Sequence, residues 1–478
     1  MKAAASETVD EAKGFAARGA ALLGVRQVLV GLFTVAGIVA LPRLLTPAEF
    51  SLYGYVNTVV LVGAALGDLG LGAYLIKNRI SDRDLSGSIA LQLAFWIPAS
   101  LLALAVGLVF SPFGFEPLTV SLLVFGLLLF SLQALPTALL EKNLAFKQIS
   151  AIEVTQRVML VGVAIVLAVL SPGQWVIPAG AAVAALFGYP AAMVVARWRW
   201  RPRFKQGEPL FRGFSSEWWQ VRAASQAAYA TYPLLGGILF TAHDVGLIVW
   251  ALAVTTIPAY LAPMVARATY PAMTRANPEH RTEIFSSLLR VLLLIGGPMI
   301  TFILIAADPL TSLVFGNEWL EGIPLLRLES ITSLIGIGLS LVIPLLFLES
   351  DPKRIKWMSV IYLAGIIVLS IALAPIVSLK AISIATIFCS SCLLVGYSLM
   401  VRSATGHNPL RDMFPAVAGI VAGCAVGLPV ALGSGSDLPV LLAGLVAALV
   451  QIGVTYALKG GISPGSVLRL LRPEPAAD

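Results

Sequence analysis

Charged residues are scarce in this chain: Asp, Glu, Lys and Arg make up 12% of its 478 residues, whereas soluble domains carry about 25%. Hydrophobic residues make up 58%, and the mean hydropathy is +0.90. These values exclude an ordinary soluble protein. The apolar runs are too long for β-barrel strands, and lipid leaves backbone polar groups partners only within a helix or a closed barrel. The sequence therefore predicts an all-α polytopic membrane protein.

Residues that usually carry enzyme chemistry are also few. The three cysteines lie in apolar runs, and although Cys389 and Cys392 have the spacing of a metal or redox motif, a helix in lipid favours ordinary packing. The three histidines lie in or beside loops, and neither an HExxH motif nor a phosphate-cradling glycine motif is present. We therefore predict no enzymatic activity, no metal, no cofactor and no ATP-driven transport by this chain alone.

Positive charge is placed asymmetrically. The formal net charge is +7, and the excess lies in short loops beside the apolar runs, which membrane topology explains without a nucleic-acid partner. Counted from a cytoplasmic start, nearly all loop Lys and Arg residues fall on the inner side, and only Arg43 and Lys380 fall on the outer side. This bias predicts that both termini are cytoplasmic and that the number of spans is even.

About fourteen transmembrane helices are predicted, forming two six-helix pseudo-repeat lobes plus two extra C-terminal helices. Their approximate bounds are 19–41, 51–76, 87–110, 118–140, 150–170, 175–196, 214–240, 246–271, 283–306, 323–348, 356–377, 380–401, 413–432 and 437–458. The predicted parts are a cytoplasmic lead-in (1–18), an N-lobe (19–196), a basic cytoplasmic linker (197–213), a C-lobe (214–401), the additional helices (402–458) and a cytoplasmic tail (459–478).

An internal repeat supports the two lobes. The segment Leu44–Leu52 aligns with Leu239–Leu247 at a spacing of about 195 residues, and each segment ends a first span and opens a second. Parallel repeats of this kind recur in transporters, with the substrate bound between the halves.

Arginines inside the spans give the strongest functional signal, because insertion costs roughly 2.5–3.5 kcal/mol for an arginine at the centre of a helix. Arg327 lies near the outer end of its span. Five others fall in the inner half of theirs: Arg26, Arg157, Arg222, Arg267 and Arg290. Snorkelling to the interface explains any one of them, but five together favour a wet cavity for an anionic cargo.

Two of these arginines hold equivalent positions in the repeat. Arg26 and Arg222 are about 196 residues apart, so each half contributes one cation at a matching depth, and together they predict a clamp. Guanidinium forks bind phosphate oxygens bidentately, which suits a pyrophosphate. Glu153 lies one turn before Arg157, a spacing that predicts an ion pair between them and leaves ion coupling as the alternative.

Polar residues near these cations extend the predicted site. Gln226 and Tyr229 lie one and two turns after Arg222, so one helix face could hydrogen-bond sugars, and Thr255 is a further candidate for sugar contact or cavity lining. Asp68, about eight residues inside the second predicted span, is either a counter-ion for Arg26 or a proton or cation site.

Three segments resemble a known family. Leu44–Tyr53, Gly67–Gly72 and Glu141–Lys147 are similar to the polysaccharide-export flippases of the Wzx type, within the multidrug/oligosaccharidyl-lipid/polysaccharide exporter superfamily. The resemblance implies translocation of an undecaprenyl-pyrophosphate-linked oligosaccharide across the bacterial plasma (inner) membrane by alternating access, for exopolysaccharide, capsule or O-antigen synthesis. It implies membrane lipids as partners, with a polysaccharide polymerase and assembly machinery as further candidates.

Two rival functions remain at this point. One is an ion-coupled multidrug or metabolite antiporter, in which Asp68 and Glu153 would bind the coupling ion and a cationic cargo. The other is a membrane scaffold for polysaccharide assembly that transports nothing. Five arginines in the inner half argue against a cationic cargo, and neutralising the buried charges would separate a scaffold from a carrier.

Overall fold

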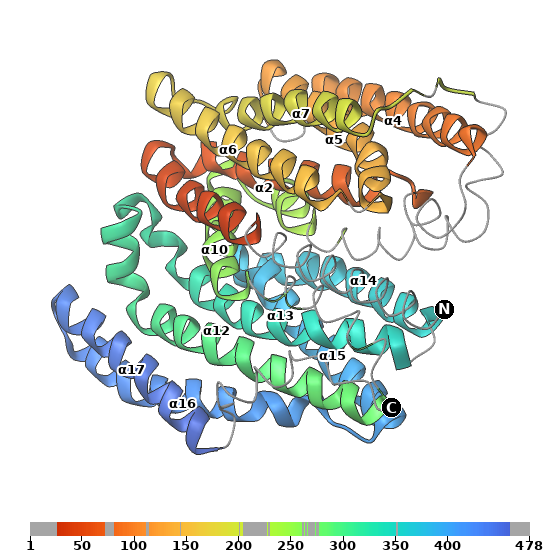
Figure 1. The fold of residues 1–478 in the computed structure, drawn as a ribbon. Helices are drawn as coiled ribbons and strands as arrows, with labels where there is room; N and C mark the ends of the chain where they lie inside the picture. The colour runs from red at the N-terminus through yellow and green to blue at the C-terminus, as the bar shows by residue number, and fades with distance from the viewer. Residues whose placement is uncertain are drawn as a thin grey trace. The chain divides into compact units, whose positions relative to one another are not determined.

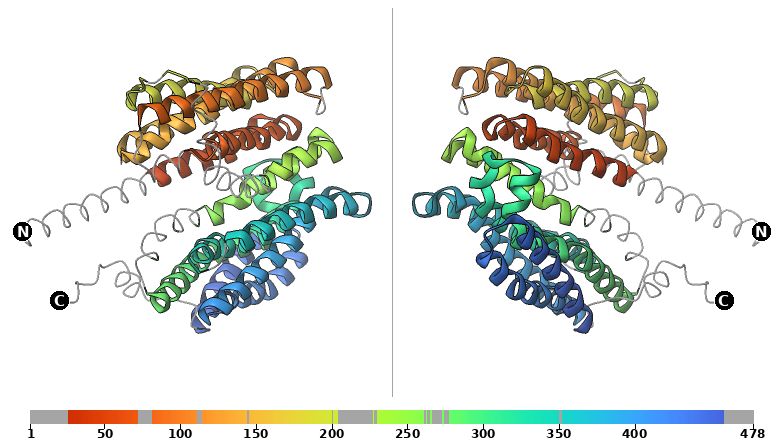
Figure 2. Two further views of the ribbon diagram at one scale, coloured as in Figure 1. Left: turned by 90° about the vertical axis from the view of Figure 1, so that its right-hand side faces the viewer. Right: turned by 90° about the vertical axis from the view of Figure 1, so that its left-hand side faces the viewer.

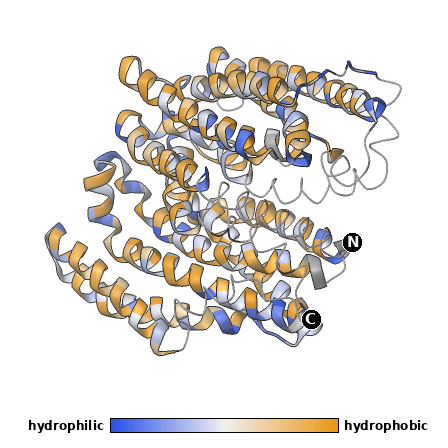
Figure 3. Ribbon diagram, viewed as in Figure 1, coloured by the Kyte–Doolittle hydropathy of each residue, from blue (hydrophilic) through white to orange (hydrophobic). Residues whose placement is uncertain are grey.

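The described residues of the protein fold almost entirely into helices (Figure 1). The structure is a computed structural model, and it describes residues 26–71, 81–110, 114–143, 145–199, 201–203, 227, 230–260, 262, 265, 273, 277–349 and 352–458. No strand occurs within these ranges. Apolar residues dominate the helix bodies, and hydrophilic residues gather toward the helix ends (Figure 3). The predicted all-α polytopic class is confirmed.

The chain divides into two compact units, Met1–Val249 and Trp250–Asp478. The first unit contains a helix at Arg26–Leu44, α2 (Pro47–Leu66), α4 (Asp82–Phe110), α5 (Pro117–Lys142), α6 (Phe146–Leu170), α7 (Val176–Val195), a short helix at Ala230–Leu239 and the first part of α10 (Ala242–Ala259). Helices α4 to α7 run alongside one another in both views of Figure 2. The predicted lobe boundaries at 197–213 remain a prediction.

The second unit contains the end of α10 and a longer series of helices. These are α12 (Pro278–Val314), the short 3₁₀ helix η2 (Asn317–Gly322), α13 (Ile323–Glu349), α14 (Pro352–Val377), η3 (Ser378–Lys380), α15 (Ala381–Thr405), α16 (Pro409–Gly433) and α17 (Asp437–Ala457). Their shared core comes from buried residues of α12, α13, α15 and α16, including Leu289, Leu341, Tyr397 and Ala416.

Eleven segments of the described chain are long and apolar enough to cross a membrane, and one of them, Arg354–Thr405, covers most of α14 and all of α15. Each predicted span overlaps a helix in the described ranges. The span predicted at 214–240 is described only from its C-terminal part, which includes Ala230–Leu239.

The span predicted at 51–76 is not one continuous helix. Helix α2 ends at Leu66, and residues 67–70 form a turn in which Leu69 and Gly70 have φ of 53° and 76°. The carbonyl of Gly67 accepts hydrogen bonds from Gln92 Nε2 at 3.0 Å and Trp96 Nε1 at 2.9 Å. Side-chain donors thus replace the helical bonds that the break removes, which lipid could not do.

The aligned repeat segments begin their helices in the same way. Thr46 and Glu49 form a capping box at the start of α2, with the Thr46 backbone N–H donating to Glu49 at 2.9 Å. At the start of α10, Thr241 N–H donates to Asp244 at 3.2 Å, and Asp244 N–H donates back to the Thr241 hydroxyl at 3.3 Å. Equivalent residues of the repeat therefore satisfy equivalent orphan backbone donors.

The two C-terminal helices pack closely against α12 through small residues. A Cβ added at Gly297 of α12 would lie 2.5 Å from Gln451 Nε2 of α17. One added at Gly423 of α16 would lie 2.9 Å from a methyl of Thr301 on α12. Such small residues let helix backbones approach each other in a membrane, where no hydrophobic effect drives association. Helices α16 and α17 are therefore integral to the second unit.

Candidate functional site

Six of the ten predicted site residues lie in described parts of the chain. Arg26 begins the described helix Arg26–Leu44, Asp68 follows α2, Glu153 and Arg157 lie on α6, Thr255 lies on α10 and Arg290 lies on α12. The other four, Arg222, Gln226, Tyr229 and Arg267, lie outside the described residues. The predicted clamp of Arg26 with Arg222 remains a prediction.

In the first unit, Arg26 is paired with Glu153. The guanidinium Nε contacts Glu153 Oε2, and the two side chains are 17% and 32% exposed. The sequence predicted Arg157 as the partner of Glu153, but the structure pairs the carboxylate with a cation more than a hundred positions away along the chain. Proximity in the helix was outweighed by a tertiary contact between α6 and the helix Arg26–Leu44.

Arg157 adds a second positive charge beside this pair. It follows Glu153 by four residues on α6, so the two side chains leave the same face of the helix. Among the described residues, no carboxylate lies within ion-pair distance of Arg157, which is partly exposed. We call Arg26, Glu153 and Arg157 the Arg26 cluster. It holds two guanidinium groups against one carboxylate, which gives a net charge of +1.

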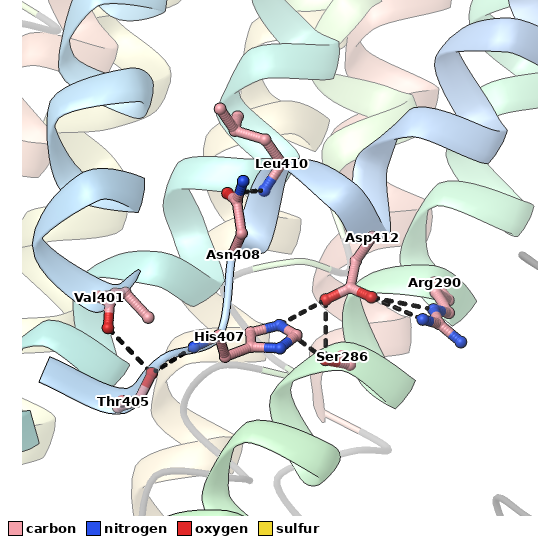
Figure 4. A network of polar contacts seen from close by, with 8 residues as sticks. All are labelled: Ser286, Arg290, Val401, Thr405, His407, Asn408, Leu410 and Asp412. Atoms are coloured by element: carbon pink, nitrogen blue, oxygen red, sulfur yellow. Dashed lines mark hydrogen bonds and ion pairs between the residues drawn. The ribbon is translucent and has the colours of Figure 1, made fainter. Parts of the chain in front are cut away.

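In the second unit, Asp412 of α16 collects four polar contacts (Figure 4). Arg290 donates to Oδ1 from Nη2 at 2.6 Å and from Nε at 3.2 Å. The Ser286 hydroxyl donates to Oδ2 at 2.8 Å, and His407 Nε2 lies 2.8 Å from the same oxygen. An ionised carboxylate only accepts, so the His407 contact requires the proton on Nε2. We call Ser286, Arg290, His407 and Asp412 the Asp412 network.

Local structure explains how three separate segments converge there. Ser286 and Arg290 are one turn apart on α12. Helix α15 ends at Thr405 and is followed by Gly406, whose φ of 74° suits glycine, and this turn places His407 beside Asp412. Asn408 caps α16 by accepting from Leu410 N–H at 3.2 Å, which leaves Asp412 in the first helical turn (Figure 4). The Asp412 side chain is 2% exposed and that of Arg290 is 36% exposed.

Sequence reasoning missed Ser286, His407 and Asp412. The predicted span began at residue 413, one position after Asp412, so this carboxylate was assigned to a loop, whereas α16 begins at Pro409. Two sequence features pointed toward this network. Ser286 and Arg290 are four residues apart and so share a helix face, and Asp412 is an acidic residue at the start of a span. Neither feature identifies its partner from the sequence.

Two further candidates make local contacts. Asp68 is buried in the turn after α2, where its carboxylate accepts a hydrogen bond from Gly70 N–H at 3.0 Å. The Thr255 hydroxyl is buried and donates to the Ala251 carbonyl at 2.8 Å within α10. These contacts stabilise the local backbone, and the roles in ion coupling and sugar contact remain predictions.

The eleven membrane-length apolar segments within the described ranges define a polytopic α-helical membrane protein. The chain belongs to the polysaccharide biosynthesis protein family, whose model matches residues 40–324. No curated protein matches the sequence.

Solved structures share the fold. The chain is similar to the lipid II flippase MurJ in an inward closed conformation, with a TM-score of 0.73, 12% sequence identity and coverage of 91% of this chain and 98% of that one. It is also similar to an inward-facing multidrug resistance MATE family transporter of the MOP superfamily, with a TM-score of 0.51, 13% identity and coverage of 80% and 94%. The predicted family resemblance is confirmed by the family model, and the fold is shared with these two structures.

Proposed function

We propose that this protein is a flippase that carries an undecaprenyl-pyrophosphate-linked oligosaccharide across the bacterial plasma membrane by alternating access. Membership in the polysaccharide biosynthesis protein family and a fold similar to that of a lipid II flippase support this proposal. The observation that carries it is the Arg26 cluster, where positive charge exceeds negative charge on partly exposed side chains within membrane-spanning helices.

The chemistry of the cargo matches this cluster. A pyrophosphate is a compact anion, and guanidinium groups bind its oxygens through paired, charge-assisted hydrogen bonds. Arg26 and Arg157 supply two such groups, and neither side chain is fully buried. The polyprenyl chain would remain in lipid, because burying its methylene groups there is favourable. The oligosaccharide would travel with the headgroup through the aqueous passage.

The orientation follows from loop charge. With both termini cytoplasmic, the Arg26 cluster lies toward the inner side, where a lipid-linked oligosaccharide made in the cytoplasm would arrive. Membrane lipids are the immediate surroundings. A polysaccharide polymerase and assembly machinery would take up the product on the outer side.

The test replaces Arg26 and Arg157 separately with Gln and follows the appearance of lipid-linked oligosaccharide on the outer face of the membrane. Each variant should lower the rate at least about tenfold, since a charge-assisted hydrogen bond to phosphate is lost. Arg327→Gln is the matched control, because Arg327 is paired with Asp308 at 2.6 Å and lies near the predicted outer end of its span. Wild-type transport by the Arg26 and Arg157 variants, at equal protein levels, would reject the proposal.

The same variants separate the carrier from its rivals. An antiporter of organic cations would keep or gain dye efflux when arginines are neutralised, because like charge near a cationic cargo is unfavourable. A scaffold would support polymer export with either arginine replaced.

A further inference from the structure

Glu153 contacts the guanidinium of Arg26, the same group that a substrate phosphate would bind. Its carboxylate contacts the Nε of Arg26, and it lies one helical turn from Arg157. Carboxylate and phosphate oxygens are the two groups that guanidinium recognises with similar geometry. A pyrophosphate that approaches Arg26 must therefore either displace Glu153 or tolerate a second anion beside it.

We propose that Glu153 is an internal surrogate for the substrate phosphate, which occupies Arg26 in the empty carrier and is displaced when the anionic headgroup binds. This inference rests on the proposed function. It adds that Glu153 sets the affinity of the site and aids release, because its carboxylate competes with the pyrophosphate for the same guanidinium.

Exposure separates this pair from a purely structural one. The Arg26 and Glu153 side chains are 17% and 32% exposed, whereas Asp412 is 2% exposed, so we expect separating this pair to cost less than separating Arg290 from Asp412. Ion pairs of this kind are weak, and a divalent or trivalent anion can outcompete a single carboxylate. Arg157 gives the anion a second cation that, among the described residues, no carboxylate pairs with.

The surrogate predicts opposite effects on binding and on turnover. In Glu153→Gln, the amide removes the competing charge and nearly keeps the side-chain shape. Binding of the anion should therefore tighten by about three- to tenfold, the scale of one partly exposed ion pair. Release should slow, so the maximal transport rate should fall while the apparent KM also falls.

The experiment uses the purified full-length protein and inorganic pyrophosphate as the probe, with affinity measured by calorimetry at constant ionic strength. Arg26→Gln should bind pyrophosphate at least about tenfold more weakly, and Glu153→Gln should bind it more tightly than wild type. Asp308→Asn is the matched control, since it also neutralises an arginine-paired carboxylate but its partner Arg327 lies near the predicted outer end of its span, and its pyrophosphate affinity should not change.

The outcomes distinguish the two proposals. If Arg26→Gln binds as tightly as wild type, the proposed anion site itself is wrong. If Arg26→Gln weakens binding while Glu153→Gln leaves it unchanged or weaker, the anion site stands and the surrogate is rejected. Should Glu153→Gln fail to fold, Glu153→Asp provides the same test, because a carboxylate withdrawn by one methylene should give a smaller tightening, and no tightening rejects the surrogate.

Discussion

The two units each pair an arginine with a carboxylate, but the pairs differ in solvent access and in hydrogen bonding. The Glu153 side chain is 32% exposed and contacts the Nε of Arg26, whose side chain is 17% exposed. Asp412 is 2% exposed and accepts from Arg290, Ser286 and His407. A buried carboxylate with all its partners in place is costly to disturb, whereas an open ion pair exchanges readily. The difference in carboxylate burial is what we expect if the Arg26 cluster serves the proposed binding and the Asp412 network anchors helices.

The Asp412 network holds three segments of the second unit together. The Asp412 network joins the first turn of α16 and the segment after α15 to α12, beside the buried side chains of Phe285 and Leu289. Arg290 was predicted to bind the substrate anion. In the structure two of its nitrogens donate to Asp412, and its role in anion binding remains a prediction.

Asp412→Asn should have the largest effect on stability. The amide cannot accept from Arg290, Ser286 and His407 as the carboxylate does, and it leaves a half-buried guanidinium without its counter-charge. We expect a loss of about 2–3 kcal/mol in the free energy of unfolding, the scale of hydrogen bonds to a charged group. Thermal unfolding of purified protein in one detergent would measure it. An unchanged midpoint would remove the distinction between the two pairs.

The sequence can predict a structural feature when the residues that form it are close together in the chain, and misses it when they are far apart. Composition and the length of the apolar runs predict the helices. The Thr46/Glu49 and Thr241/Asp244 caps were not predicted, although their partners are only three residues apart in the sequence. The break at Gly67 was missed, since its hydrogen bonds come from Gln92 and from Trp96 on another helix.

The candidate site shows the same limit. Burial of arginines in apolar runs indicated a charged site, and the carboxylate Glu153 was correctly singled out as a residue of interest. Its partner was predicted wrongly because Arg157 is near in sequence, whereas Arg26 is brought to it only by helix packing. Asp412 and His407 were missed for the same reason, because their contact with α12 spans more than a hundred residues.

Ser286→Ala and His407→Gln should sharpen the comparison with smaller effects. Each variant removes one of the contacts to Asp412 Oδ2 and leaves the Arg290 pair intact. We expect each to lower the free energy of unfolding by about 1 kcal/mol, a typical net value for one hydrogen bond. Combined with Asp412→Asn, either change should add little, since its partner is already altered. Full additivity in the double variants would show that the four residues do not act as one network.

Glu153→Gln should change stability less than any variant of the Asp412 network. The pair with Arg26 is partly exposed, so its removal should cost no more than about 1 kcal/mol. The measurement is the same thermal unfolding, with Asp412→Asn run in parallel. A loss as large as that of Asp412→Asn would mean that Glu153 anchors the helix Arg26–Leu44 to α6 rather than serving a binding site.

Salt should separate the two clusters with the smallest perturbation of the protein. Raising the ionic strength from 0.1 M to 1 M shortens the Debye length from about 10 Å to about 3 Å, which screens exposed charges strongly and buried ones weakly. Pyrophosphate binding to the Arg26 cluster should weaken several-fold across this range, measured by calorimetry with chloride as the added anion. The difference in unfolding midpoint between wild type and Asp412→Asn should stay nearly constant, because Asp412 is sealed from solvent. If this difference in unfolding midpoint instead falls as steeply with salt as the pyrophosphate affinity does, ions reach Asp412. The two arginine–carboxylate pairs would then not differ in solvent access.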